Sequence, residues 1–307
     1  MNKNPVFSIV IPAYNRANII YRAIDSVLTQ TYNNYEIIVV DDGSTDNLKD
    51  ICNGYNSEKI KYVYQEKNGS NPARNNGIKH SKGTYVSFLD SDDEWRNNYL
   101  AEIYKKFQMD NDIGFVYTKY IRIHLPKRKK KIKKLKNIEG YIYKKVLKQG
   151  YLINSSCITV KRSVLENICI NGDYWDNNLF ACQDDDICIR LSKITKIGFI
   201  NEILCTTYID DRIDRISSSK SRRAYNTFSL WEKHKEDIIQ YCGIKNFEKK
   251  IFKVYISFLN INDKQGQYKC KNILSVYSKI PDYKYNIIKI KYLYFKIIKN
   301  IRLFLKI

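Results

Sequence analysis

Aspartates gather at three places in the sequence, at 41–42, at 90–93 and at 184–186. The 307 residues include 53 Lys and Arg against 32 Asp and Glu, a formal net charge of +21, so such grouping of negative charge needs a reason. Carboxylates make turns and cap helices, but they also act as general bases and bind divalent cations. Asp90 and Asp92 suit Mg²⁺ or Mn²⁺ best, because two like charges so close need a cation or a proton between them.

The elements that would position these clusters alternate between strand and helix. Four short apolar runs have the composition of buried strands: Phe7–Ile11, Glu36–Val40, Ile60–Tyr64 and Thr84–Leu89. Helices are predicted between them, at residues 19–28, 46–55 and 72–80. This alternation predicts a Rossmann-like α/β fold, with a mostly parallel sheet flanked by helices. Ligands of such sheets bind beyond the carboxyl ends of the strands, where Asp41 and Asp90 stand.

Several polar residues are predicted to have local roles at the helix ends. We expect Asn18 to cap the first helix, and Asp42 and Asp46 to open the second. In the cluster at 184–186, Asp186 is predicted to be a cap, and Arg190 is predicted to form an ion pair within its helix.

The second hundred residues continue the mixed pattern. Strands are predicted at 114–120 and 156–160, after a helix that begins at Tyr99. Eight of the ten residues at 127–136 are basic, which predicts a solvated loop, because no protein interior could hold them. Beyond about residue 220 the pattern is helical and basic.

Cysteine usage and hydropathy bear on the compartment. The eight cysteines contain no C-x-x-C pair, so they are predicted to be reduced core residues. The first apolar run, Phe7–Ile11, is too short for a secretory signal. No stretch reaches the roughly 18 apolar residues of a membrane-spanning helix. These features predict a cytoplasmic protein.

Five segments resemble the successive signatures of family 2 glycosyltransferases, whose catalytic domain has the GT-A fold. They are 7–16 (FSIVIPAYNR), 26–32 (SVLTQTY), 36–46 (EIIVVDDGSTD), 72–78 (PARNNGI) and 88–95 (FLDSDDEW). The resemblance extends over about residues 5–220. It implies a catalytic domain at 1–220, with a nucleotide-binding half at about 1–95 and an acceptor-binding half at about 96–220. A helical region at 221–307 with an amphipathic basic tail would follow.

The resemblance also implies which residues bind the donor. Members of this family transfer a sugar from a nucleotide to an acceptor hydroxyl, with inversion at the anomeric carbon. By the resemblance, Pro12 and Tyr14 line the nucleotide pocket, and Asp41 bonds the uracil. Arg74 would lie beside the base and phosphates, and Asp90 would meet the ribose or the donor sugar.

In the same way the family resemblance assigns a metal and its ligand. Asp92 is implied to be the direct ligand of Mn²⁺ or Mg²⁺ in the D-x-D motif, and Asp90 is a further candidate ligand. A divalent ion there would neutralise the charge of a diphosphate leaving group. Asp93 either contacts the sugar or caps the next helix.

Inversion by single displacement needs a general base within reach of the acceptor hydroxyl. The family supplies it from a Glu-Asp pair at the start of a helix, and the matching stretch here begins Gln183-Asp184-Asp185. Asp184 is therefore implied to be the base. Because Gln183 replaces the usual Glu, Asp185 is the alternative if the helix begins one residue later.

A later segment, 208–218, resembles the family's tyrosine-arginine segment, which closes over the diphosphate. Arg212 and Arg215 are the candidates for a diphosphate clamp, with ordinary surface charges as the alternative. Many relatives carry a metal-binding histidine there, and this segment has none. Either Asp214 replaces it, or water and phosphate complete the metal's ligands.

Much of the positive charge lies in the 127–136 segment and in the tail at 285–307. On a helical wheel the tail has an apolar face that includes Ile290, Leu293 and Ile297 and a basic face that includes Lys289, Lys296 and Lys299. Such a helix is typical of the surface of an anionic membrane. The alternative is a helix that packs on the catalytic domain. The first reading predicts peripheral association with the inner membrane.

Together these features predict an inverting transferase that moves a hexose, glucose or galactose, from a UDP-sugar to an undecaprenyl-diphosphate-linked saccharide in O-antigen or capsule assembly. A UDP-N-acetylhexosamine donor is the alternative for the same acceptor. A nucleotidyltransferase would need a glycine-rich phosphate loop after the first strand, and residues 12–16 contain no glycine. A basic nucleic-acid-binding module is disfavoured, because three carboxylate clusters would repel phosphates. We therefore expect no nucleic-acid partner.

Overall fold

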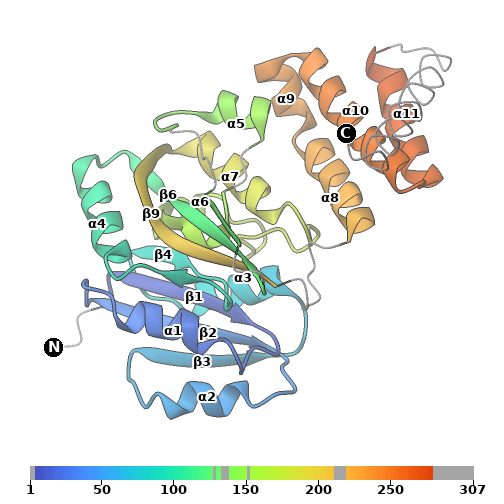
Figure 1. The fold of residues 1–307 in the computed structure, drawn as a ribbon. Helices are drawn as coiled ribbons and strands as arrows, with labels where there is room; N and C mark the ends of the chain where they lie inside the picture. The colour runs from blue at the N-terminus through green and yellow to red at the C-terminus, as the bar shows by residue number, and fades with distance from the viewer. Residues whose placement is uncertain (1–3, 127–128, 133–137, 151–152, 211–218, 279–307) are drawn as a thin grey trace. The chain divides into compact units, whose positions relative to one another are not determined.

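The computed structural model describes residues 4–126, 129–132, 138–150, 153–210 and 219–278 (Figure 1). The chain forms two compact units, Met1–Ile216 and Ser217–Ile307. The first is an α/β domain built on one sheet, and the second is helical where it is described.

The sheet in the described part of the first unit has nine strands in the order β3-β2-β1-β4-β8-β6-β9-β5, with β7 paired to β6. Its parallel half consists of β1 (Phe7–Ala13), β2 (Tyr35–Asp42), β3 (Ile60–Gln65) and β4 (Tyr85–Phe88). Every residue of β1 and all but one of β2 are buried, because helices and loops cover both faces. This half confirms the predicted Rossmann-like α/β arrangement.

The other half of the sheet is mixed, and this was not predicted. It consists of β5 (Glu94–Trp95), β6 (Ile113–Leu125), β7 (Lys129–Ile132), β8 (Ile158–Lys161) and β9 (Lys196–Asp210). β8 runs antiparallel to both β4 and β6, whereas β9 runs parallel to β6. β9 also pairs with β5, so it reaches the chain just after the Asp90–Asp93 cluster.

Seven α-helices are described in the first unit: α1 (Tyr21–Leu28), α2 (Leu48–Gly54), α3 (Ser70–His80), α4 (Tyr99–Met109), α5 (Tyr143–Gln149), α6 (Arg162–Asn167) and α7 (Gln183–Ile194). Of these, α3 packs on β1 and β2. A Cβ atom at Gly77 would lie 2.3 Å from Cγ1 of Val10 and 3.1 Å from Cγ2 of Val40. The α3 backbone therefore lies so close to the sheet that a side chain at this position does not fit.

Two predicted helix caps are wrong. α1 begins at Tyr21 rather than after Asn18, because a turn with hydrogen bonds to the Arg16 carbonyl precedes it. Asp42 does not open α2; its carboxylate accepts hydrogen bonds from the backbone of the 68–69 turn instead. Asp46 does open α2, since its Oδ1 accepts from the Leu48 backbone at 3.3 Å.

The prediction of a solvated loop at 127–136 is wrong for part of this segment. Lys129–Ile132 forms β7, which pairs antiparallel with Ile121–His124 of β6. On the same edge of β6, β8 pairs only with Phe115–Tyr117, so the end of this long strand is open to a further partner. Regular pairing at a sheet edge is compatible with lysines, because alternate side chains of an edge strand can face solvent.

The second unit contains α8 (Lys220–Lys233), α9 (Lys235–Cys242), α10 (Ile244–Asn260) and α11 (Lys264–Ser278). Their shared core includes Leu230, Phe247, Val254 and Phe258. The tail at 285–307 lies outside the described residues.

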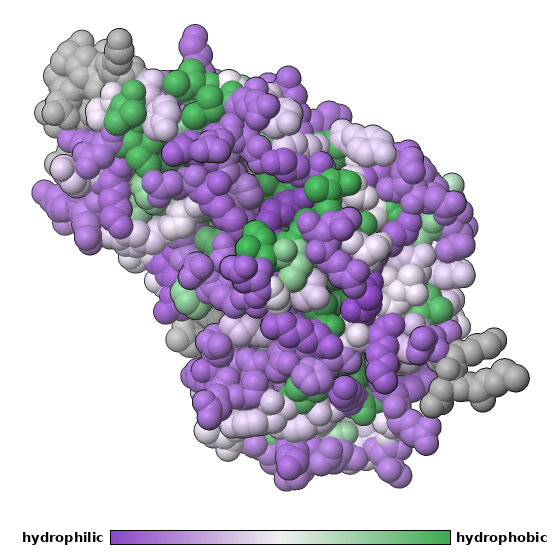
Figure 2. Space-filling view, turned by 180° about the vertical axis from the view of Figure 1, so that it is seen from behind, coloured by the Kyte–Doolittle hydropathy of each residue, from purple (hydrophilic) through white to green (hydrophobic). Residues whose placement is uncertain are grey.

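No described helix is long and apolar enough to cross a bilayer. The face of the molecule in Figure 2 is mostly hydrophilic, and its hydrophobic residues form small separate groups. All eight cysteines are free, and five of them are buried, which confirms their prediction as reduced core residues for those five: Cys52, Cys157, Cys188, Cys205 and Cys270.

The close approach of α3 to the sheet leads to a stability prediction. Gly77→Ala should lower the free energy of unfolding by about 1–3 kcal/mol, because the added methyl group overpacks the contact with Val10 and Val40. Gly54→Ala is the matched control, since its Cβ would have no atom within 4 Å. Urea unfolding of both variants measures the difference. Equal stability of the two would contradict the packing argument.

Candidate active site

The carboxyl ends of β1, β2 and β4 lie at one edge of the sheet. Ala13, the last residue of β1, is level with Asp41 on β2, and Val10 is level with Phe88 at the end of β4. The chain segments that follow these strands carry Tyr14, Asp42 and Asp90. The parallel register therefore brings together motifs that are up to about 80 residues apart in sequence.

Asp41 is buried at the end of β2 and holds the turn that follows. Its Oδ1 accepts a hydrogen bond from the Ser44 backbone at 2.8 Å, and its Oδ2 accepts one from the Tyr62 hydroxyl at 2.5 Å. Burial and this hydrogen bond raise the pKa of Tyr62 well above its ordinary value. These two hydrogen bonds fix the orientation of the Asp41 carboxylate at the carboxyl end of β2.

Tyr14 and Pro12 lie at the end of β1. Pro12 is buried in the strand itself, opposite Val40, whereas the predicted strand ended at Ile11. Tyr14 is half-buried, and the Nζ atom of Lys67 lies 3.9 Å from the centroid of its ring. A Cβ on Gly43 would lie 2.7 Å from the Lys67 backbone nitrogen, so the loops after β2 and β3 touch at a glycine.

Arg74 and Asp90 form the central ion pair of this region. Arg74 Nη2 lies 2.7 Å from Asp90 Oδ1, and the arginine is only 3% exposed. The guanidinium also stacks over Trp175, with its Cζ 4.8 Å from the ring centroid. The Ser155 hydroxyl lies 3.2 Å from both oxygens of Asp90. Asp90 is therefore neutralised and held by groups from two other segments.

Asp92 and Asp93 have different surroundings. Asp93 is buried; it accepts hydrogen bonds from the Ser156 hydroxyl at 2.6 Å and from the Tyr208 backbone at 3.0 Å. Burial, and then the charges of Asp92 and Asp90, raise the pKa of Asp93 well above its ordinary value. Asp93 does not cap α4, which begins six residues later. Asp92 is only partly buried, and its backbone carbonyl accepts from Arg22 at 3.1 Å.

Asp184 lies in the first turn of α7, as predicted. Burial raises its pKa to about 7, against the lowering effect of Arg74; the charge of Asp90 raises it further, and the Ser155 backbone and Arg122 lower it. Its Oδ1 is buried and has no hydrogen-bond partner in the described part of the chain. A carboxylate that titrates near neutral pH beside the Arg74–Asp90 pair can accept a proton from a bound hydroxyl group.

The next two aspartates contribute differently. Asp185 is buried. Asp186 is not a cap; its Oδ2 accepts from Arg190 Nε at 2.8 Å, one turn further along α7, which confirms the predicted role of Arg190. Arg190 also donates to the backbone carbonyls of Ile168 and Tyr174. Arg74 and Asp90 are among the charges that shift the pKa of Asp184, and this favours Asp184 over Asp185 as the candidate base.

Several residues of this region were missed by sequence reasoning. Ser155 and Ser156 belong to the 3-10 helix η1 (Ser155–Cys157) and bind the two ends of the acidic motif. The Trp175 ring contacts the Arg74 guanidinium, and the Lys67 ammonium lies over the Tyr14 ring. A Ser or Trp in an irregular segment has no periodicity to reveal its role, and the neighbouring Asn154 signals only a local cap.

Arg212, Asp214 and Arg215 lie outside the described residues. In the described ranges no three His, Cys, Asp or Glu side chains group as metal ligands. Mg²⁺ and Mn²⁺ are commonly bound through one or two carboxylates together with substrate phosphates. The donor set of Asp92, with Asp90 beside it, therefore fits such an ion with a diphosphate bound.

Comparison with known proteins bears on this site. The model of glycosyl transferase family 2 matches residues 8–169, more than half of the chain. The chain belongs to glycosyltransferase family 2. Of the curated members, the putative teichuronic acid biosynthesis glycosyltransferase TuaG of Bacillus subtilis is 40% identical over 122 residues, 39% of this chain and 48% of TuaG. Other curated glycosyltransferases, 40–44% identical, are matched over only 17–19% of their own length.

Solved structures share the GT-A fold of this family 2 chain. TarS residues 1–349 of Staphylococcus aureus, in complex with UDP-GlcNAc, has a TM-score of 0.58 at 18% identity, covering 89% of this chain and 73% of that one. The mannosyltransferase PcManGT of Pyrobaculum calidifontis, in complex with GDP-Man and Mn²⁺, has a TM-score of 0.58 at 17% identity, covering 98% and 88%. At this level of identity the likeness establishes the fold alone.

The raised pKa of Asp184 leads to a pH-dependent stability prediction. The folded pKa of about 7 exceeds the unfolded value of about 3.9, so ionising Asp184 costs the folded state stability as pH rises from about 4 to 7. Asp184→Asn removes this cost. Its stabilisation relative to wild type should be larger at pH 8 than at pH 5.5 by roughly 2 kcal/mol.

Urea unfolding at the two pH values measures this difference. Gln183→Ala, in the same helical turn, is the control, because it changes no titratable group and should have the same effect at both pH values. A stabilisation by Asp184→Asn that does not change with pH would show that the Asp184 pKa is ordinary.

Proposed function

We propose that this chain is an inverting glycosyltransferase that moves a hexose from a UDP-sugar to a saccharide hydroxyl, with Asp184 as the general base. The observation that carries the proposal is the half-buried carboxylate of Asp184, with a pKa of about 7, beside the Arg74–Asp90 pair. The family match supports the reaction class, and the predicted nucleotide-binding residues follow the adjacent strands.

The reaction would be a single displacement. The acceptor oxygen attacks the anomeric carbon as the bond between that carbon and the diphosphate breaks, and UDP leaves with the bonding electrons. Asp184 takes the proton from the attacking hydroxyl. A pKa near 7 suits this role, because the base is then largely ionised at neutral pH and still basic enough to accept the proton.

The binding residues divide between the two sides of the donor. Tyr14 and Asp41 would contact the base of the nucleotide, and Arg74 with Asp90 would lie toward its sugar and phosphates. Pro12 would line the same pocket. Asp93 would hold the segment Asp90–Asp93 in place through its bonds to Ser156 and the Tyr208 backbone. Arg212 and Arg215 remain predictions from the sequence, as candidates for binding the diphosphate.

Asp92 is proposed to hold Mn²⁺ or Mg²⁺, with Asp90 or Asp214 as further candidate ligands. Such an ion would neutralise the diphosphate charge that develops on the leaving group. The Mn²⁺ in PcManGT supports this proposal, as that enzyme has a similar fold.

Glucose or galactose is the proposed sugar. N-acetylglucosamine is the second candidate, and the complex of TarS with UDP-GlcNAc favours it. The proposed acceptor is an undecaprenyl-diphosphate-linked saccharide in the assembly of a surface polymer. The name of TuaG, a putative teichuronic acid biosynthesis glycosyltransferase, supports that context.

The proposed place of work is the cytoplasmic side of the inner membrane, with the basic tail at 285–307 on the lipid. The catalytic domain would be residues 1–220, and residues 221–307 would form the helical extension. About 1 kcal/mol for each basic residue near an anionic surface would suffice for reversible binding.

Activity measurements test the assigned roles. Asp184→Asn should lower kcat by about 10²–10⁴-fold, because the general base is lost. Mutation of a residue that only supports a metal ligand by a hydrogen bond typically lowers activity roughly 10–100-fold. Asp92→Ala removes the proposed ligand itself, so it should lower activity with Mn²⁺ by more than this. UDP release from UDP-Glc, UDP-Gal, UDP-GlcNAc and UDP-GalNAc, with a synthetic lipid-diphosphate N-acetylglucosamine as acceptor, is the measurement. Asp50→Asn, on the exposed face of α2, is the control.

Two results would contradict these roles. Full activity after chelation of divalent ions would exclude the proposed metal. Undiminished activity of both variants would exclude the proposed base and metal ligand together.

A separate experiment tests the membrane proposal. Truncation after residue 284 should abolish co-sedimentation with liposomes that contain anionic lipid. A full-length variant with Lys289, Lys291, Lys296 and Lys299 changed to Gln should bind up to about 10³-fold more weakly at low salt, since each change removes about 1 kcal/mol of attraction. Unchanged binding of both proteins would overturn the role of the tail and point to residues 127–136.

A further inference from the structure

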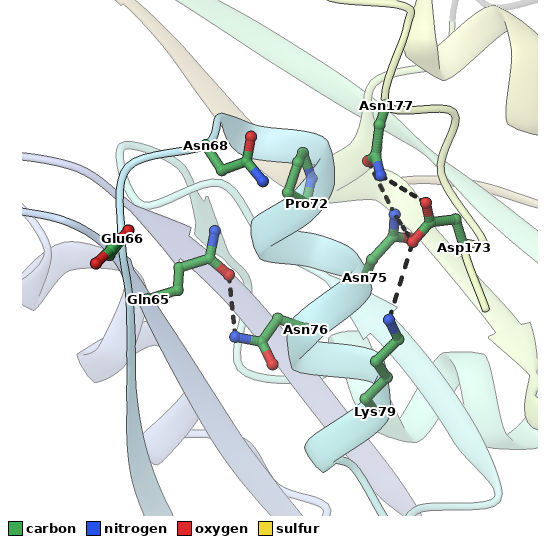
Figure 3. A pocket seen from close by; sticks show the side chains of 9 residues that line it. All are labelled: Gln65, Glu66, Asn68, Pro72, Asn75, Asn76, Lys79, Asp173 and Asn177. Carbon is green, nitrogen blue, oxygen red and sulfur yellow. Dashed lines mark hydrogen bonds and ion pairs between the residues drawn. The ribbon is translucent and has the colours of Figure 1, made fainter. Parts of the chain in front are cut away.

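A pocket of about 380 Å³ lies on the outer side of α3, between the end of β3 and the segment at 173–177 (Figure 3). Its walls are rich in carboxamide side chains, among them Gln65, Asn75, Asn76 and Asn177. Carboxamides can bind a polar ligand only if their donors and acceptors are available. The hydrogen bonds that these residues already make therefore determine whether they can bind a ligand.

Asn75 has no bonding capacity left for a ligand. Its Oδ1 accepts from the backbone nitrogens of Trp175 at 2.8 Å and Tyr174 at 3.0 Å. Its Nδ2 donates to the Trp175 carbonyl at 2.9 Å, to Asn177 Oδ1 at 3.1 Å and to Asp173 Oδ1 at 3.2 Å. A carboxamide has two donor hydrogens and two acceptor lone pairs, so Asn75 is fully used. It is also only 2% exposed.

Asn71, one helical turn earlier, makes the same kind of contact. Its Nδ2 donates to the backbone carbonyls of Asp176 at 2.8 Å and Leu179 at 2.7 Å. Asn71 and Asn75 together bind four backbone positions between 174 and 179. We call these two residues and segment 173–179 the α3 clamp.

The α3 clamp holds the chain immediately before the candidate base. Only four residues separate Leu179 from Asp184. The segment is also bound from the other side, because Arg190 of α7 donates to the Tyr174 carbonyl at 2.5 Å. The start of α7 is thus tied to α3 through a short segment with fixed ends.

The same helix holds the partner of the base. Arg74 stands between the two clamp residues on α3, stacks over Trp175 of the clamped segment and binds Asp90. One rigid helix therefore determines both where the Arg74–Asp90 pair lies and where the chain leading to Asp184 lies. A displacement of about 1 Å at such a site can lower the rate by about 10²-fold.

We propose that Asn75 is a positioning residue for the transfer reaction, which holds Asp184 at its working distance from the Arg74–Asp90 pair through the α3 clamp. This inference rests on the proposed function, in which Asp184 is the general base. Asn75 touches neither substrate nor metal in this role. It acts through the backbone of segment 173–179.

Asn75→Ala tests the proposal, and Asn76→Ala is its matched control. Asn76 is the next residue on α3 and has the same side chain, but its Nδ2 donates away from the clamp, to Gln65 Oε1 at 3.0 Å. Asn177→Ala is a milder variant, because it leaves the bonds between Asn75 and the Trp175 backbone intact. The measured quantities are kcat for UDP release, with the four UDP-sugars named above and water or the synthetic acceptor, and the Kd for UDP.

Asn75→Ala should lower kcat at least tenfold and leave the Kd for UDP within twofold, because the base moves while the nucleotide pocket does not. Asn177→Ala should lower kcat about two- to fivefold, and Asn76→Ala should change neither quantity more than twofold. An equal loss of kcat and UDP affinity in Asn75→Ala would show a general structural role and overturn the proposal. If Asn75→Ala fails to fold by circular dichroism, an unchanged kcat in Asn177→Ala would overturn it.

Asp184→Asn, measured alongside, separates the two hypotheses. If Asp184→Asn is inactive and Asn75→Ala matches Asn76→Ala, the base assignment stands and the positioning role is wrong. If Asp184→Asn is fully active, the proposed function fails, and the positioning role fails with it.

Discussion

The ion pair between the buried guanidinium of Arg74 and the partly exposed carboxylate of Asp90 is the interaction on which the rest of the site depends. Four aspartates, at 90, 92, 93 and 184, come close together here, and such a cluster would repel itself without a cation. A guanidinium that is almost fully buried supplies the permanent positive charge. Removal of Asp90 would leave the buried guanidinium of Arg74 without its carboxylate partner, and an uncompensated buried charge is strongly destabilising. The pair therefore makes the acidic cluster compatible with folding.

Around this pair, segments distant in sequence are joined through polar groups. Ser155 and Ser156 bind Asp90 and Asp93, and the Trp95 indole donates to the Ser156 carbonyl at 2.6 Å. Tyr208, near the end of β9, binds Asp93 through its backbone and Glu94 through its hydroxyl. Contacts from η1, β9 and α3 consequently hold the segment Asp90–Asp93 in place before any ligand binds.

Local patterns in the sequence predicted the parallel half of the sheet, the helix that carries Arg74 and the helix that carries Asp184 in its first turn. They did so because apolar runs, strand ends and helix starts are encoded within a few residues of one another. The clamp contacts, the role of Ser155, strand β9 and the antiparallel pairing of β8 with β4 and β6 were not predicted, although strands at 114–120 and 156–160 were. Their roles depend on contacts across 65–108 residues of sequence, and an asparagine or serine looks the same whether it faces solvent or a distant backbone.

The contact of Gly77 with Val10 has a consequence for how this chain can vary in length. A helix turns about 100° per residue, so one residue inserted or deleted within α3 would rotate its later side chains away from their partners. Near Gly77 the sheet leaves no space for such a rotation. Insertions and deletions between relatives should therefore avoid α3 and occur in the connections between elements. Residues 70–80 would then keep a constant length and a constant spacing of the site residues that they carry.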